Sequence, residues 1–143
     1  VSKPQYRLEV TSYKMKKDLI SHGCIPKKSF FITFPNFIDI NQYRHFVRGY
    51  FDGDGCLTIP QKNPNNVTFT ITSNTKFCDG IVDYINNALG VNMKSCNRYG
   101  NIGVARLTGR KQVKLLLNWL YSDSKIFMKR KFDKFKNNII FTK

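Results

Sequence analysis

The stretch that decides the fold reads Phe46-Val47-Arg48-Gly49-Tyr50-Phe51-Asp52-Gly53-Asp54-Gly55. The run from Ile40 to Phe51 is compatible with a helix, and Gly53 and Gly55 predict its end, because glycine adopts positive φ there at little cost. Asp54 then lies at a helix C-terminus, where the helix dipole disfavours a further negative charge. A carboxylate in that place indicates a bound cation. A helix–turn–strand junction, with Asp-Gly-Asp-Gly as turn residues only, is the alternative interpretation.

The nine residues 47–55 resemble the signature of the LAGLIDADG homing endonucleases. Four residues are identical to that signature: Gly49, Asp52, Asp54 and Gly55. The positions at 47, 50 and 51 keep its apolar character, and residue 53 keeps a small one. Arg48 departs from the alanine of the family name and is similar to a variant in intein-associated members.

The composition is strongly basic, with 24 Lys and Arg against 9 Asp and Glu and a net charge of +15. Nucleic acid is therefore the leading partner, because neutralised phosphates release counterions. A solubilising basic surface and attraction to anionic lipid are the alternatives. No apolar stretch approaches the ~20 residues of a membrane helix, and no signal peptide is visible, so we expect no membrane partner.

Cysteine usage bears on the compartment. The four cysteines are Cys24, Cys56, Cys78 and Cys96. They lack Cys-x-x-Cys spacing, and His22 and His45 do not complete a zinc pattern. We expect reduced, mostly packed cysteines in an intracellular protein, in the cytoplasm of a prokaryote or phage-infected cell or in an organelle. A disulfide between distant cysteines is the less favoured alternative.

Alternation and periodicity predict the remaining elements. Before residue 40 they predict a strand at Tyr6–Thr11, a helix that begins after Ser12 and ends at Gly23, and a strand at Ser29–Phe34. After the helix that ends near 54, they predict strands at 56–61 and 67–73 with a turn at 63–66, a helix at 77–89, strands at 91–96 and 102–108, a helix at 112–121 and a basic amphipathic helix at 126–136. This order predicts the α+β class, with an antiparallel sheet and helices on one face. The opposite face would be polar and free.

The family resemblance extends beyond the motif and suggests two domains. In residues 1–39, Leu19, Gly23, Lys28-Ser29 and Phe34-Pro35 are similar to the end of a first half in two-motif members. Residues 40–143 resemble one complete endonuclease domain, and the Arg-Lys-aromatic run near residue 131 resembles the closing segment. The N-terminal segment is therefore expected to be a remnant of a first half. A natural remnant, one piece of a split protein and a processed chain all stay open.

The resemblance also implies a chemistry. Asp54, with Gly53 beside it, would hold Mg²⁺ or Mn²⁺, and a second half would supply the matching carboxylate. Lys129 or Lys131 would assist the attacking water or the phosphate, and Ser73 would lie near that water. A plain phosphate contact or solvent exposure is the alternative for each. Asp52 is expected to have a structural or capping role. The halves would meet along the motif helix through Val47, Gly49, Tyr50 and Gly53, as a homodimer or with a separate first half.

The polar sheet face is implied to lie in the DNA major groove, whose base edges side chains can read. The candidates for DNA contact are Thr58, Gln61, Lys62, Thr68, Thr70, Thr72, Lys76, Lys94, Asn97, Arg98 and Arg106. Ordinary polar strand surface is the alternative, and we expect half or fewer to touch bases. The implied function is site-specific, metal-dependent double-strand cleavage by an intron, intein or free-standing endonuclease. A catalytically idle nucleic-acid binder, such as an intron RNA maturase, is the competing hypothesis.

Overall fold

The computed structural model describes residues 7–63 and 65–140. Contacts divide the chain into two units, Val1–Ile32 and Thr33–Lys143. The boundary at residue 40 that the sequence suggests concerns ancestry and stays a prediction.

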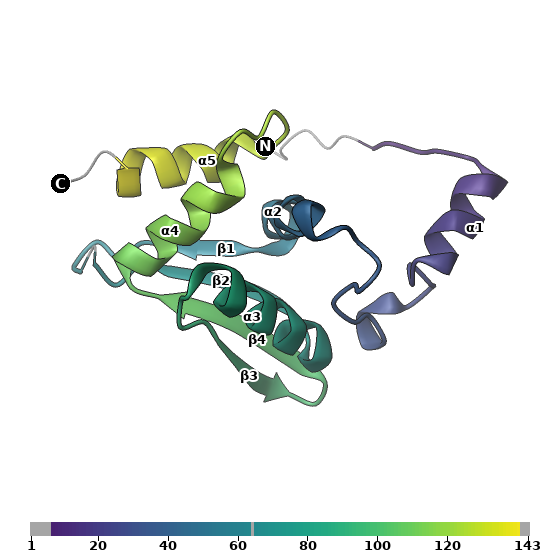
Figure 1. The fold of residues 1–143 in the computed structure, drawn as a ribbon, viewed down its shortest axis with the longest axis horizontal. Coiled ribbons are helices and arrows are strands. Elements are labelled where there is room, and N and C mark those ends of the chain that lie inside the picture. Colours follow the sequence, from purple (N-terminus) through teal and green to yellow (C-terminus); the bar gives the residue numbers. More distant parts are fainter. Residues whose placement is uncertain (1–6, 64, 141–143) are drawn as a thin grey trace, which may run out of the picture. The chain divides into compact units, whose positions relative to one another are not determined.

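The first unit is built around one helix, α1, Tyr13–Ser21 (Figure 1). Ser12 caps it as predicted, since its Oγ accepts a 3.2 Å hydrogen bond from the amide of Met15. Gly23, with φ of +83°, follows the helix end, where the left-handed region favours glycine. No residue of α1 is buried.

The two strands predicted in this unit are wrong. Residues 7–11 are irregular, while Tyr6 lies outside the described residues. The segment expected to be the second strand contains a turn of 3₁₀-helix, η1, Lys28–Phe30. A strand needs a neighbouring strand for its backbone hydrogen bonds, and the described part of this unit offers none.

The second unit begins with η2, Ile40–Gln42, which leads into the motif helix α2, Tyr43–Asp54. Gly53 is still helical and Gly55 is extended (φ −73°, ψ 161°), so the prediction that these glycines use positive φ is wrong. Residue 55 must be small because its backbone packs closely against Phe51. A Cβ there would lie 2.2 Å from the ring of Phe51 and 2.7 Å from its carbonyl oxygen.

A four-stranded antiparallel sheet follows, in the order β1-β2-β4-β3. Its strands are β1 Cys56–Thr58, β2 Thr68–Asn74, β3 Lys94–Tyr99 and β4 Ile102–Thr108. The first strand is shorter than predicted, and the third begins three residues later than the predicted 91–96. Part of the predicted turn at 63–66, residue 64, lies outside the described residues.

Helices cover one face of this sheet, which confirms the α+β prediction. They are α3 Thr75–Leu89, α4 Arg110–Tyr121 and α5 Lys129–Phe135, which continues into a turn of π-helix, η3, Lys136–Ile140. Figure 1 shows α3 lying over β2 and β4. The alternation in β2 sends Phe69 and Ile71 into this core, and Phe51 of α2 stacks on Phe69 with a centroid distance of 4.4 Å.

The cysteines only partly match the prediction. All four are free. Only Cys78 is buried, so the expectation of mostly packed thiols is wrong for Cys24, Cys56 and Cys96, which are exposed. Among the helices that the structure describes, none combines the length and apolar character needed to cross a bilayer.

Candidate functional site

Asp54 is the last residue of α2 and is exposed. Within the described residues, its carboxylate has no hydrogen-bond or ion-pair partner. The final carbonyl groups of a helix lack partners within the helix, and the negative end of the dipole lies there. Asp54 therefore adds a free negative charge to a negative helix end.

Asp52 has the opposite environment, although only Gly53 separates it from Asp54. Asp52 is buried and accepts hydrogen bonds from the Tyr121 hydroxyl (2.7 Å) and the Met128 amide (2.9 Å). Burial raises the pKa of Tyr121 far above its usual range, and the bond to Asp52 adds to that rise. Asp52 thus holds α4 and the start of α5 against α2.

Lys131 reaches the end of α2 from α5. Its buried ammonium donates hydrogen bonds to the carbonyl oxygens of Phe51 and Gly55, the latter over 2.5 Å. It also lies 4.9 Å from the centroid of the Phe51 ring. Burial lowers the pKa of Lys131 and Arg130 lowers it further, while nearby carboxylates, Asp54 among them, act against this. Lys131 therefore places a positive charge at the helix end that carries Asp54.

Lys129 does not share this position. Its side chain is exposed and forms an ion pair with Asp133 one turn along α5, at 2.5 Å. Of the two candidate lysines, the structure brings only Lys131 to the carbonyls at the end of α2.

Ser73 lies on the helix-covered side of the sheet, where the hydroxyl of Tyr50 donates to its Oγ over 2.9 Å. The Tyr50 ring stacks on Phe77 with a centroid distance of 4.5 Å. Burial raises the pKa of Tyr50, and the charge of Asp54 raises it further. Ser73 and Tyr50 therefore form a half-buried pair within the electrostatic reach of Asp54.

A second face of α2 is bare. Gly49 and Gly53 are exposed, and a Cβ built on either meets no atom within 4 Å. The other two predicted interface residues differ, since Tyr50 is half-buried and Val47 has no exposed surface. Val47 packs inside its own unit and is not available to a partner, which corrects the prediction for that residue.

Sequence reasoning missed the polar contacts that join another face of α2 to the end of α4 and the segment that follows it. Arg44, Arg48 and Asp52 are spaced by four residues and so lie on one face of the helix. Arg44 donates to Ser122 and Asp123. Arg48 donates to the carbonyl oxygens of Leu120 and Ile126 and also contacts Nδ1 of His45. The i, i+4, i+8 spacing was the available signal. Arg48, the departure from the family's alanine, binds the connection between α4 and α5.

The uncovered face of the sheet carries six of the predicted DNA contacts. Strand register places Thr70 beside Arg106 and Arg106 beside Lys94, and Thr58 beside Thr68. Thr72 continues the same alternation along β2. These six side chains are exposed or half-buried. The face is therefore polar and positively charged, as predicted from alternation.

The other candidates for DNA contact lie elsewhere. Gln61 and Lys62 are in the connection after β1, and Lys76 is in the first turn of α3. Asn97 pairs with Gly103 on the helix-side alternation and donates to the carbonyl of Gly100 over 2.9 Å. Arg98 falls at a register irregularity of β3, a β-bulge. Asn97 therefore supports the hairpin turn.

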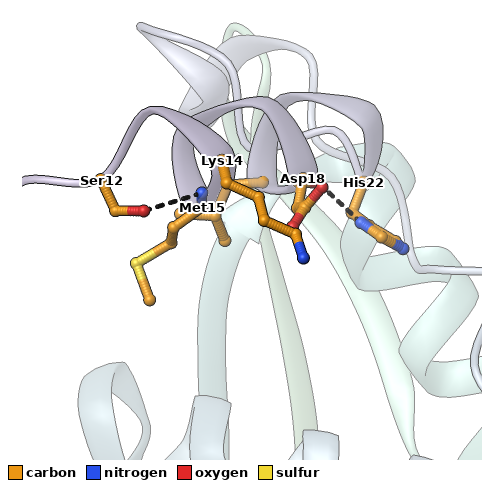
Figure 2. A pocket seen from close by; sticks show the side chains of 6 residues that line it. Ser12, Lys14, Met15, Asp18 and His22 are labelled. Atoms are coloured by element: carbon orange, nitrogen blue, oxygen red, sulfur yellow. Dashed lines mark hydrogen bonds between the residues drawn. The ribbon is translucent and has the colours of Figure 1, made fainter.

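A surface hollow beside α1 offers no comparable chemistry (Figure 2). The polar side chains of Ser12 and His22 that line it form hydrogen bonds with the backbone of α1. Ser12 Oγ accepts from the Met15 amide, and His22 Nδ1 donates to the Asp18 carbonyl over 2.6 Å. Met15 and Leu19 supply its apolar lining.

The donors at the end of α2 suit a hard divalent cation, but only in part. Carboxylate and carbonyl oxygens are the ligands that Mg²⁺ and Mn²⁺ prefer. In the part of the chain that the structure describes, no three His, Cys, Asp or Glu side chains gather into a metal cluster. Asp54 and the Gly53 carbonyl fit as one side of such a centre, which a second carboxylate would complete.

Comparison with known families agrees with this geometry. A family profile described as a LAGLIDADG-like domain matches residues 41–139, which include α2, the whole sheet and α5. The chain belongs to the LAGLIDADG family. Among curated protein sequences, nothing matches the chain.

Solved structures support the LAGLIDADG fold. The homing endonuclease I-TnaI is 16% identical with a TM-score of 0.50, over 68% of this chain and 71% of that one. The group I intron-encoded homing endonuclease I-CeuI, solved with DNA, is also 16% identical with a TM-score of 0.50, over 87% of this chain and 64% of that one. At such low identity these similarities establish the fold alone.

Proposed function

We propose that the chain is a site-specific endonuclease that makes metal-dependent double-strand cuts in DNA held against the uncovered face of its sheet. The observation that best supports this proposal is the position of Asp54. An exposed carboxylate without a partner in the described residues ends a helix whose bare face carries two glycines.

A complete centre needs two such helix ends. Gly49 and Gly53 have no side chains and open space beside them, so a second α2 can approach closely at these two positions. A two-fold homodimer would bring two Asp54 carboxylates together and favour a near-palindromic target. A separate first half is the alternative partner and would favour an asymmetric target.

The chemistry is hydrolysis of a phosphodiester. A water molecule gives up a proton and its oxygen bonds to phosphorus, while the bond from phosphorus to the 3′ oxygen breaks and that oxygen takes up a proton. Bound Mg²⁺ or Mn²⁺ would make water more acidic and neutralise charge on the phosphate oxygens. Asp54 and the Gly53 carbonyl would hold the ion.

The chain's own side chains have distinct tasks in this proposal. Lys131, fixed by two carbonyls, keeps positive charge beside Asp54 and stabilises negative charge on the phosphate. Ser73 accepts from Tyr50 and keeps its own proton to orient the attacking water. Lys129, which is exposed, contacts the DNA backbone.

The test is cleavage by Asp54→Asn. A target is first selected from randomised duplex DNA with the wild-type chain. Asp54→Asn should then bind this target with nearly unchanged affinity. Its cleavage rate should fall by more than the about 10- to 100-fold loss of activity that follows removal of an outer-shell partner of a metal. Asp83→Asn, an exposed aspartate of α3, is the matched control and should cut normally.

Two results would overturn the proposal. A normal cutting rate of Asp54→Asn would remove Asp54 from the centre. Binding of RNA without metal-dependent cleavage of any duplex DNA would show a catalytically idle nucleic-acid binder.

A further inference from the structure

We infer that the uncovered face of the sheet contains an apolar strip, Val104, Ile102 and Tyr99, whose exposed members Ile102 and Tyr99 read thymine methyl groups next to the scissile bonds. The inference rests on the proposed function, since it requires this face to lie in the major groove of DNA.

Strand register defines the strip. Val104 pairs with Thr72 on one side and Cys96 on the other, and Ile102 pairs with Tyr99 at the tip of the β3–β4 hairpin. These residues continue the alternation of Arg106 along β4 and thus share its face. One row away, Arg106 lies between Thr70 and Lys94. The face therefore has a charged row and, beside it, an apolar strip.

The strip lies toward the Asp54 end of the sheet. Asp54 ends α2, and β1 begins two residues later at Cys56, which pairs with Thr70. Because β2 runs antiparallel to β1, Thr72 lies beyond the start of β1 on the side of Asp54. Thr72 and its partner Val104 are therefore closer to the proposed cutting site than the row of Arg106. Contacts from this strip would fall in the inner part of each half-site.

Exposure gives the strip its chemistry. Ile102 is 46% exposed and Tyr99 is 81% exposed, whereas Val104, which lies between Ile102 and Arg106 along β4, is only 5% exposed. Large apolar side chains left in water on a basic face indicate a partner with apolar groups. The major groove offers one such group, the C5-methyl of thymine. Guanine and cytosine would instead bring polar edges that Ile102 leaves unpaired, at a cost.

The strip therefore favours A·T pairs close to the cut, whereas Arg106 and Lys94 suit guanine further out. This gives an ordered target: A·T at the inner positions and G·C at the positions facing the charged row.

The chain offers a close control for Ile102. Leu115 is 47% exposed, almost the same as Ile102, but belongs to α4 in the helical layer. Serine at either position removes a comparable amount of exposed apolar surface. Only the change at Ile102 alters the face proposed to contact DNA.

The experiment uses the full wild-type chain to select duplexes from randomised DNA, and then replaces single inner thymines of the target by deoxyuridine, which lacks the methyl group. Binding is measured for wild type, Ile102→Ser and Leu115→Ser. Wild type and Leu115→Ser should each lose about fourfold in affinity at one inner position, the ratio expected for burying one methyl-sized group. Ile102→Ser should bind the thymine and deoxyuridine duplexes equally.

The outcomes separate this inference from the proposed function. The strip is overturned if replacing each inner thymine of a selected duplex leaves binding unchanged, or weakens binding of Ile102→Ser as much as that of wild type. Either result leaves the endonuclease proposal standing. Failure to select any duplex overturns both.

Discussion

The Tyr121 hydroxyl donates a 2.7 Å hydrogen bond to Asp52, and Asp54, two residues further on, has no such partner in the described residues. The two aspartates of one motif therefore have different roles. Asp52 accepts hydrogen bonds that join α2 to α4 and to the amide of Met128. Asp54 stays exposed at the end of α2, where the proposed metal ion would bind.

The first prediction concerns this bond. Tyr121→Phe keeps the ring but leaves the buried Asp52 carboxylate one donor short, so the free energy of unfolding should fall by about 1–3 kcal/mol. Urea unfolding measures it. Tyr99→Phe removes an exposed hydroxyl and should stay within about 0.5 kcal/mol of wild type. Equal stability of wild type and Tyr121→Phe would contradict the role given to Asp52.

The second prediction is a loss of stability at high pH. The folded state raises the pKa of Tyr121 above its usual value of 10.0, so above that pH the unfolded chain releases this proton while the folded chain keeps it. Stability from this group is complete below pH 10 and falls as pH rises, with a limiting slope of about 1.4 kcal/mol per pH unit. Unfolding of Tyr121→Phe should lack this contribution. Parallel stability curves for the two proteins between about pH 9.5 and 11 would refute it.

The sequence predicted the second unit well because its signals are local. Alternation in 67–73 and the amphipathic spacing of 77–89 report directly which side chains are buried, and β4 begins and ends where predicted. In the first unit the same alternation predicted two strands that do not form, because a strand depends on a partner strand that a local pattern does not reveal.

The candidate site was predictable where one residue acts alone and not where two distant segments meet. The motif singled out Asp54 as a candidate and predicted its position at the end of α2. It did not show that Lys131 reaches the carbonyls of Phe51 and Gly55, or that Arg48 binds the connection after α4. Val47 was misassigned because an apolar position in a motif helix does not by itself reveal whether it faces the core or a partner.

The third prediction separates the two lysines. Lys131→Met keeps apolar contact with Phe51 but removes two hydrogen bonds and a charge from the end of α2. It should therefore lower stability by about 1–3 kcal/mol and abolish cleavage of the selected duplex. Lys129→Met removes an exposed ion pair worth at most about 1 kcal/mol and should mainly weaken DNA binding. Urea unfolding and plasmid cleavage measure both. The assignment fails if the two variants behave alike.

The fourth prediction concerns salt. With a net charge of +15, DNA affinity should fall steeply as salt rises, with a log–log slope of about −0.9 for each phosphate contacted. Lys94→Gln, on the uncovered face, should reduce the slope by about one such contact. Lys111→Gln, an exposed lysine of α4, should leave it unchanged. A flat salt dependence of the wild type would exclude nucleic acid as the main partner.

Assembly through the bare face of α2 is the central claim, and Gly49→Leu tests it. A Cβ at 49 meets no atom of the described residues within 4 Å, and replacing a helical glycine favours the helix by about 0.5–1 kcal/mol. Gly49→Leu should therefore fold at least as stably as wild type while keeping two α2 helices apart.

The deciding measurement is light scattering of wild type and Gly49→Leu on the selected duplex, with cleavage followed in the same samples. We predict two wild-type chains per duplex that cut both strands, and Gly49→Leu chains that stay folded, do not pair and do not cut. Cleavage by a single wild-type chain, or unchanged pairing and cutting by Gly49→Leu, would contradict the account.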